Sequence, residues 1–147
     1  MTFLSRRALV AIATVVDVAL HARPTPVSAK VLAARHGMGP RHLESVLNAL
    51  VRAAILKGVR GPRGGYELAR ERRRITLAEI VRAAAPASTE GLDTEHSPLI
   101  ASVIAPALDR AAEVFLSELD RITVEALCEK AGGLGIPETS NIADFTI

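Results

Sequence analysis

Apolar residues recur every three or four positions along three stretches of the first 54 residues, a spacing typical of amphipathic helices. The first stretch predicts a helix over about residues 5–21 with one apolar and one polar face. The apolar face comprises Leu9, Ile12, Ala13, Val16 and Leu20, and the polar face comprises Arg7, Thr14, Asp17 and His21. The Ser-Arg-Arg start is similar to a twin-arginine signal, but the polar face interrupts the apolar run, which indicates a helix of a soluble domain.

Two further helices are predicted, separated by a short turn. Ser28 is a good N-cap for a helix that continues to about His36. Residues 37–39 form a glycine-rich turn, after which Gly39 can cap a third helix and Pro40 suits its first position. This helix runs to about residue 54, and its apolar face comprises Leu43, Val46, Leu47, Leu50 and Ala54. Helix, short turn and helix indicate a helix-turn-helix.

A Gly-rich hairpin is predicted directly after the third helix. Two short extended runs, residues 55–57 and 66–68, flank a turn whose residues 60–65 contain three glycines and a proline. Arg60 and Arg63 lie at its tip. A narrow cationic hairpin can enter a minor groove or lie along a phosphate ridge, so we interpret it as the wing of a winged helix-turn-helix. An ordinary solvated turn is the alternative, which the preceding helix-turn-helix makes less favourable.

The second half is predicted to hold a linker and one long helix. Thr76 and Glu79 form a capping box for a short helix that ends near residue 85. Residues 86–98 are rich in Pro, Ser, Thr and Gly and read as a linker. A helix with a kink at Pro106 is expected over about residues 99–121, then a segment over residues 122–131. The tail, residues 132–147, has weak periodicity, and we expect it to be loosely ordered.

The long helix carries a broad apolar stripe that a small domain cannot fully cover. The stripe comprises Ile100, Val103, Ile104, Ala107, Leu108, Ala111, Val114, Phe115 and Leu119. We expect a homodimer in which the stripe meets its copy, with Ile100, Ile104, Ala107, Ala111, Val114 and Phe115 at the interface. Packing against the first helix of the same chain is an alternative, and both arrangements can hold at once.

Charge divides the chain. Residues 1–85 hold 15 Lys and Arg against 5 Asp and Glu, whereas residues 86–147 hold 3 against 11. A basic module followed by an acidic one predicts a polyanionic partner for the first half only. The chain contains one Tyr and no Trp, which disfavours binding of single strands by aromatic stacking.

The sequence therefore predicts a mainly α fold: a winged helix-turn-helix domain with a small β-hairpin wing, plus a long C-terminal dimerisation helix. The expected divisions are a DNA-binding domain over 1–85, a linker over 86–98, a dimerisation region over 99–131 and a tail over 132–147. No run is apolar enough to span a membrane. No nucleophile–base pair or phosphate-cradling loop suggests an enzyme.

The second helix of a helix-turn-helix reads the major groove with its N-terminal residues. Arg can bond guanine O6 and N7, and Asn can bond adenine N6 and N7. The candidate DNA-binding residues are Ser28, Arg41, His42, Glu44, Ser45, Asn48, Arg60, Arg63, Gly64 and Gly65. The alternative is that the polar positions of the third helix are only its solvated face.

The ordered motifs of residues 4–85 resemble those of the Rrf2 family of winged helix-turn-helix regulators. The resemblance rests on Asp17–Leu20, Pro26–Ser28, His42–Glu44, Arg60–Pro62, Gly64–Tyr66, Ile75–Leu77 and Glu79–Val81. It implies a dimeric transcription regulator that binds a palindromic operator. Carried over by position, Glu44 contributes to base discrimination, Arg60 reaches the minor groove, and Gly64 and Gly65 shape the wing turn.

The chain departs from the family pattern at two places. Residues 39–42 read Gly-Pro-Arg-His where a Ser-rich lead and a Tyr are common, so we expect a different operator. Many members also hold an iron–sulfur cluster with three Cys between the winged domain and the long helix, but residues 86–98 contain none. His96, Asp93 and Glu95 favour a solvated acidic loop over a metal site. We therefore expect no cluster, metal or other cofactor.

Cys128, the one cysteine of the chain, has two readings: a buried, inert thiol, or a redox switch through an intermolecular disulfide. One thiol supplies neither an internal disulfide nor a zinc site, which fits a cytoplasmic setting. We expect a repressor that binds double-stranded DNA and responds to an unknown small molecule or protein. The alternative is a winged-helix module that contacts proteins and not DNA.

Overall fold

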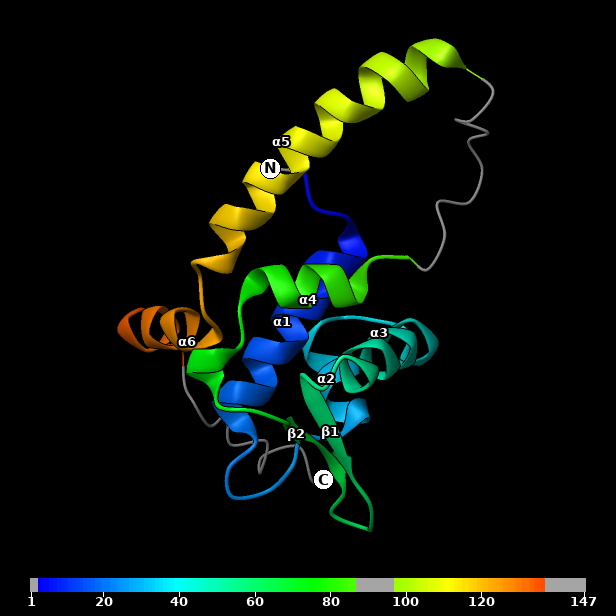
Figure 1. The fold of residues 1–147 in the computed structure, drawn as a ribbon. Helices are drawn as coiled ribbons and strands as arrows, with labels where there is room; N and C mark the ends of the chain where they lie inside the picture. The colour runs from blue at the N-terminus through cyan, green and yellow to red at the C-terminus, as the bar shows by residue number, and fades with distance from the viewer. Residues whose placement is uncertain (1–2, 87–96, 137–147) are drawn as a thin grey trace.

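A computed structural model describes residues 3–86 and 97–136 of the 147-residue chain. Helix α1 (Arg6–His21) is the central element, with α4 crossing it on one side and α6 beside it (Figure 1). The helix-turn-helix is formed by α2 (Ala29–Arg35) and α3 (Pro40–Arg52). Strands β1 (Leu56–Val59) and β2 (Gly65–Leu68) form the wing. The predicted class, mainly α with a two-stranded antiparallel wing, is confirmed.

The predicted helix starts are confirmed by their caps. The Ser5 hydroxyl accepts a hydrogen bond from the Ala8 amide, and the Ser28 hydroxyl accepts one from the Val31 amide. Each bond satisfies an amide that has no partner within its own helix. Gly39 caps α3 in an extended conformation, and Pro40 occupies its first turn. The predicted helix-turn-helix is therefore built from local signals that the sequence carries openly.

The predicted polar face of α1 is covered by other parts of the domain. Thr14 is fully buried and Asp17 is 7% exposed. The Asp17 carboxylate accepts from Arg35 Nη1 at 2.5 Å and from His21 Nδ1 at 2.9 Å, and His36 Nε2 lies 3.0 Å from its second oxygen. The charge is thus paired where α2 ends against α1. Because α3, α4, α6 and β2 also pack on α1, no side of this helix is left wholly to solvent.

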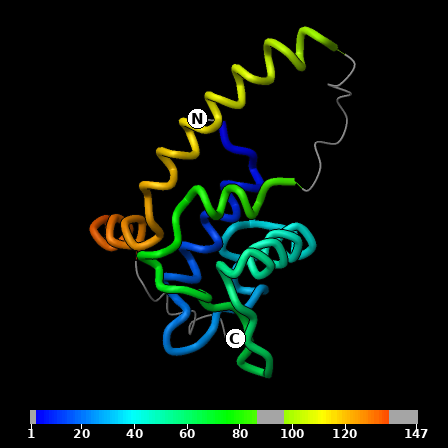
Figure 2. The backbone as a smooth tube through the Cα atoms, viewed as in Figure 1, coloured from blue at the N-terminus to red at the C-terminus, as the bar shows by residue number. Residues whose placement is uncertain are grey.

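The wing is tied to the start of α2. Leu56 pairs with Leu68 and Val59 with Gly65 in an antiparallel register. Val27 forms a bridge to Tyr66, and the Tyr66 amide donates to the Val27 carbonyl at 2.8 Å. The hairpin extends beyond the other elements of the winged domain (Figure 2). The wing is therefore a projecting hairpin with a fixed base.

A short 3₁₀ turn, η1 (Arg72–Arg74), leads into α4 (Leu77–Ala84), and the predicted capping box is present: Thr76 and Glu79 exchange hydrogen bonds. Thr76 also pairs with Thr123, which caps α6 (Val124–Gly133). Val124 is fully buried and joins the core that α1, α3 and α4 share. The segment predicted over 122–131 is thus a helix packed on the winged domain, and it extends to Gly133.

The predicted long helix is present as a π-helical turn, η3 (Ile100–Ile104), followed by α5 (Ala105–Asp120). The Ala105 amide donates to the Ile100 carbonyl five residues back, just before Pro106, which has no amide to donate. The first turns of this helix stand away from the rest of the described chain (Figure 1). The predicted linker and tail fall largely on residues 87–96 and 137–147, which lie outside the described residues.

Candidate nucleic-acid interface

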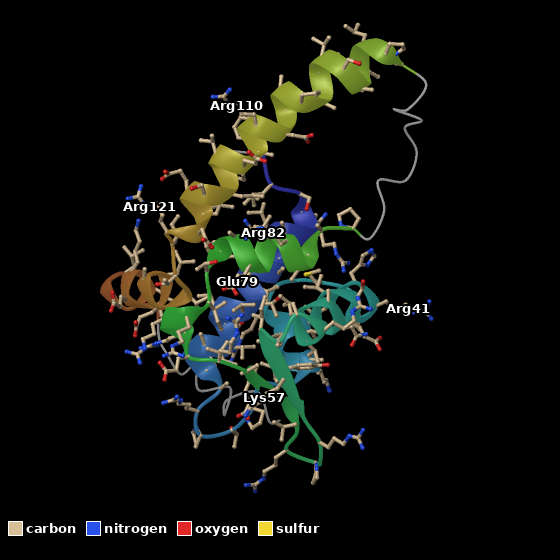
Figure 3. The ribbon with its side chains drawn as sticks, viewed as in Figure 1. Arg41, Lys57, Glu79, Arg82, Arg110 and Arg121 are labelled. Carbon is tan, nitrogen blue, oxygen red and sulfur yellow. The ribbon has the colours of Figure 1, made fainter. Side chains whose placement is uncertain are left out.

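The predicted reading residues of α3 share one exposed face. Arg41, His42, Glu44 and Asn48 are all exposed, and none of their side chains has a hydrogen-bond or ion-pair partner within residues 3–86 and 97–136. The opposite face of α3 fills the core through Leu43, Val46, Leu47 and Leu50. Arg41 points away from the domain at the outer side of α3 (Figure 3). These side chains are held by a rigid helix and are available to a ligand.

Ser45 is exposed on the same face but is already engaged. Its hydroxyl oxygen accepts a hydrogen bond from Arg7 Nη1 at 2.9 Å, and its carbonyl accepts one from Arg7 Nη2 at 3.2 Å. The hydroxyl hydrogen of Ser45 remains available to donate. The structure thus separates Ser45, an anchor for α1, from the four unengaged residues around it.

The wing carries two exposed cations on a tightly packed turn. Arg60 and Arg63 are exposed and have no partner within the described part of the chain. A Cβ on Gly64 would lie 2.3 Å from the Val59 carbonyl oxygen, and one on Gly65 would lie 2.4 Å from the Val27 carbonyl oxygen. Only glycine fits these approaches, because real Cβ contacts are not this short. Gly64 and Gly65 therefore shape the wing and seat it beside α2.

The space between the wing and α2 is an open groove. Ser28, Ala29, Arg60, Gly64 and Tyr66 are among its lining residues. Ser28 is half-buried there, with its hydroxyl used as the cap of α2. Ser28 and Arg60, both predicted from the sequence as DNA-binding residues, line the same groove. The groove between the wing and α2 is thus accessible to a ligand.

Ion pairing divides the arginines and lysines of the first half. Arg35, Lys57, Arg70 and Arg73 pair with carboxylates, as does Arg72 at 3.7 Å from Glu125. The other exposed cations of the helix-turn-helix and wing are not paired within the described residues. They include Lys30 in α2 and Arg52 in α3, which sequence reasoning missed. The basic excess of residues 1–85 was the signal, but it does not show which cations are neutralised.

The predicted dimerisation residues are exposed along η3 and α5, with two exceptions. Ile100 and Phe115 are half-buried, whereas Ile104, Ala107, Ala111 and Val114 are exposed. Val103 and Leu108 are also more than half exposed. At the C-terminal end of α5, Leu119 is buried in the core of the winged domain. One helix therefore contacts its own domain and leaves an apolar face uncovered by residues 3–86 and 97–136.

Cys128 is 1% exposed within α6 and belongs to the shared core. Among the described residues, no three His, Cys, Asp or Glu side chains lie together in an arrangement that would hold a metal ion. The donor set of one thiolate per chain does not fit a cluster ligated by several cysteines. No helix among the described residues is long and apolar enough to cross a membrane.

The sequence of the chain is similar to those of known transcriptional regulators. Residues 4–130 match the model of the Rrf2 family, described as iron-dependent transcriptional regulators. Over 73 residues the chain is 38% identical to the ORF2 protein of Azotobacter vinelandii and 37% identical to the HTH-type regulator IscR of Xenorhabdus nematophila. Each match spans 50% of this chain and 44% of the relative, so the chain covers less than half of either relative's length.

Solved structures share the fold over most of the chain. The structure of T. potens IscR superposes with a TM-score of 0.70 at 28% identity, covering 88% of each chain. CymR of B. subtilis superposes with a TM-score of 0.64 at 24% identity, covering 88% of this chain and 98% of that one. The second likeness concerns the fold alone. The match extends beyond the winged domain and so includes the helical second half.

Proposed function

The chain belongs to the Rrf2 family of transcriptional regulators, and on that basis we propose that it binds a palindromic DNA operator as a homodimer and represses transcription. The observation that carries the proposal is the set of unpartnered polar and cationic side chains on α3 and the wing. Elsewhere in the same domain, Arg35, Arg70, Arg72 and Arg73 are paired with carboxylates. A surface that keeps its cations unpaired suits a polyanionic ligand.

Recognition would divide between the two elements. The first turns of α3 enter the major groove, where Arg41 can bond a guanine and Asn48 an adenine. Glu44, between them on the helix surface, can accept from a cytosine amino group. Arg60 and Arg63 of the wing contact the minor groove or the phosphates beside it. Ser28 lies at the edge of this surface, beside Arg60.

Dimerisation would use the exposed face of α5. A twofold axis along the paired helices places two reading helices about one turn of DNA apart, which is why the operator is expected to be palindromic. Ile104, Ala107, Ala111 and Val114 form the centre of this interface, with Ile100 and Phe115 at its ends. The same pairing removes from water the apolar side chains that the chain's own described residues leave exposed.

The protein would act in the cytoplasm. It would hold no iron–sulfur cluster, because one cysteine per chain supplies too few ligands for one. A small molecule or a partner protein would supply the signal. A redox response through Cys128 requires α6 to open first, since the thiol is buried in the core.

Selection from a random duplex library tests the proposal. The wild-type chain should enrich a sequence with two inverted half-sites, and the Arg41→Ala and Arg60→Ala variants should bind it more weakly. The main alternative is a winged-helix module that contacts proteins and not DNA. Failure of the wild-type chain to enrich any sequence at low salt would favour that alternative.

A further inference from the structure

Arg7 makes contacts that the stability of its own helix does not explain. It is the second residue of α1, where the positive end of the helix dipole disfavours a cation. Its guanidinium reaches two other helices instead. Nε donates to the Ala84 carbonyl at 2.9 Å, Nη1 to the Ser45 hydroxyl at 2.9 Å, and Nη2 to the Ser45 carbonyl at 3.2 Å.

The two anchors of Arg7 lie at informative places. Ala84 is the last residue of α4, so its carbonyl has no amide partner within that helix and the negative end of the dipole favours a cation there. Ser45 lies on α3, one turn after Arg41 and next to Glu44. One planar group therefore joins the centre of the reading face to the end of α4.

Helix α4 is linked to α5 both by the chain and by packing. After Pro86 the chain passes through residues 87–96 and re-enters the described structure ahead of η3 and α5. Helix α4 also packs directly against α5. A displacement of α5 against the domain would thus reach α4 by a packed contact, and Arg7 is bonded both to the end of α4 and to α3.

We propose that Arg7 is a positioning residue that couples the reading helix to the end of α4, and through it to α5. The inference rests on the proposed function, and it names the path by which the dimer interface sets the separation of the two reading helices. Arginine suits this role because its rigid fork of five donors can serve two acceptors at once. Lysine, a point charge on a flexible stem, cannot hold the same two helices in one geometry.

A phosphate contact is the competing role for Arg7, because the residue adjoins the proposed DNA surface. The two roles differ in what they require of the side chain. A phosphate contact requires only a positive charge, so lysine should replace arginine, and loss of the charge should lower the salt dependence of binding by about one counterion. A coupling contact requires the fork, so lysine should fail as methionine does.

The experiment compares Arg7→Met, Arg7→Lys and Ser45→Ala with Arg6→Met as the matched control. Arg6 is exposed, adjoins Arg7 and has no partner within the described residues. The probe is the duplex that the wild-type chain enriches from a random library, resynthesised with its centre one base pair longer or shorter. The readouts are affinity at each spacing, the salt dependence of binding and the melting temperature of the protein.

For the wild-type chain we expect a marked preference for the original spacing. In Arg7→Met and Arg7→Lys this preference should fall by about 2- to 30-fold, the range that residues along a coupling path typically show. Ser45→Ala should reduce it in the same direction, and Arg6→Met should leave it unchanged. A role limited to stability would lower the melting temperature and weaken binding equally at every spacing, which would overturn the proposal.

Two further results would also overturn it. If Arg7→Lys behaves like the wild-type chain while Arg7→Met loses one counterion of salt dependence, Arg7 is a phosphate contact. If the wild-type chain enriches no duplex, the proposed function itself fails and the coupling role fails with it. The first result leaves DNA binding intact, so the two failures are distinguishable.

Discussion

At the scale of single residues, the winged domain separates cations that hold the fold from cations that face outward. Arg7 and Arg35 bridge helices, with Arg35 bonded to the buried carboxylate of Asp17. Arg41, Arg60 and Arg63 are exposed and have no partner among the described residues. An unpaired surface cation gains little from folding, so its position on the reading helix or the wing is better explained by a ligand.

Arg60 should contribute directly to DNA affinity. Replacing it with Ala is expected to cost about 1–3 kcal/mol of operator binding if the guanidinium reaches base edges. Fluorescence anisotropy with the enriched duplex measures the loss. Arg74→Ala, which removes an exposed and unpaired arginine of η1, is the matched control and should change affinity much less. Equal affinities for Arg60→Ala and wild type would show that Arg60 of the wing does not contribute to DNA binding.

Asp17 should be a stability residue. Asp17→Asn removes the negative charge that Arg35, His36 and His21 share, and leaves the Arg35 cation beside a neutral group. Breaking a buried ion pair from one side costs about 3–5 kcal/mol, and because Arg35 is 21% exposed we expect about 3 kcal/mol. Urea unfolding measures the change. Glu71→Gln, at an exposed ion pair with Arg73, should be close to neutral.

The outward residues could be predicted from the sequence, whereas the bridging residues could not. The 3.6-residue period of α3 separates Arg41, Glu44 and Asn48 from the core, and that prediction needs no other part of the chain. The helical period of α1 also places Arg7 and Asp17 on a polar face. In the structure, however, Arg7 contacts α3 and α4, and Asp17 contacts α2. The partners of Arg7 lie 38 and 77 residues away, and local periodicity carries no information about them.

At the scale of elements, short local signals fix the reading helix and the wing, while pairing between distant caps fixes the second half. Thr76 caps α4, donates to Asp120 at the end of α5 at 2.8 Å and forms a bridge to Thr123 at the start of α6. The α5–α6 pair is thereby attached to the winged domain. The sequence predicts the capping box but not this attachment, because Asp120 and Thr123 lie far from Thr76 in the sequence.

The wing glycines provide an element-scale test. Gly65→Ala places a methyl group against the Val27 backbone, and overpacking of this kind typically costs about 1–3 kcal/mol. Gly58→Ala is the matched control in the same hairpin, since its Cβ would meet nothing within 4 Å. Thermal unfolding compares the two. Equal melting temperatures would show that the wing is not seated on Val27 as described.

The Thr76 cap provides a second test at this scale. Thr76→Val keeps the size of the side chain but removes the hydroxyl that caps α4 and bonds Asp120. Loss of a cap typically costs about 0.5–2 kcal/mol, and the second bond places the expected loss near the upper end. Urea unfolding gives the value. Thr25→Val, in the exposed loop before α2, should have little effect, and a loss as large there would contradict the assignment.

At the scale of the whole molecule, the chain combines a basic winged domain with an exposed apolar helix. The long helix formed by η3 and α5 buries Leu119 in the domain and exposes Val103, Leu108 and Val114 by about 60% each. An apolar face of this kind, on a protein that we propose reads DNA, is suited to a second copy of the chain. Dimerisation then doubles the number of phosphate contacts without any change within the domain.

Val114 tests the assembly. Val114→Glu places a charge on the exposed face of α5, so the dimer should dissociate while the fold remains intact. Sedimentation velocity should give a monomer with unchanged circular dichroism, and operator affinity should fall with it. Ser117→Glu, also exposed on α5, is the control and should remain dimeric. A dimeric Val114→Glu variant would place the interface on another surface.

The stoichiometry and salt dependence of DNA binding test the central claim most directly. Sedimentation of the wild-type chain with its enriched duplex should give two chains per duplex, and affinity should fall steeply as salt rises because the basic half displaces counterions from phosphate. A chain that stays monomeric and fails to sediment with any duplex in dilute buffer would contradict the account.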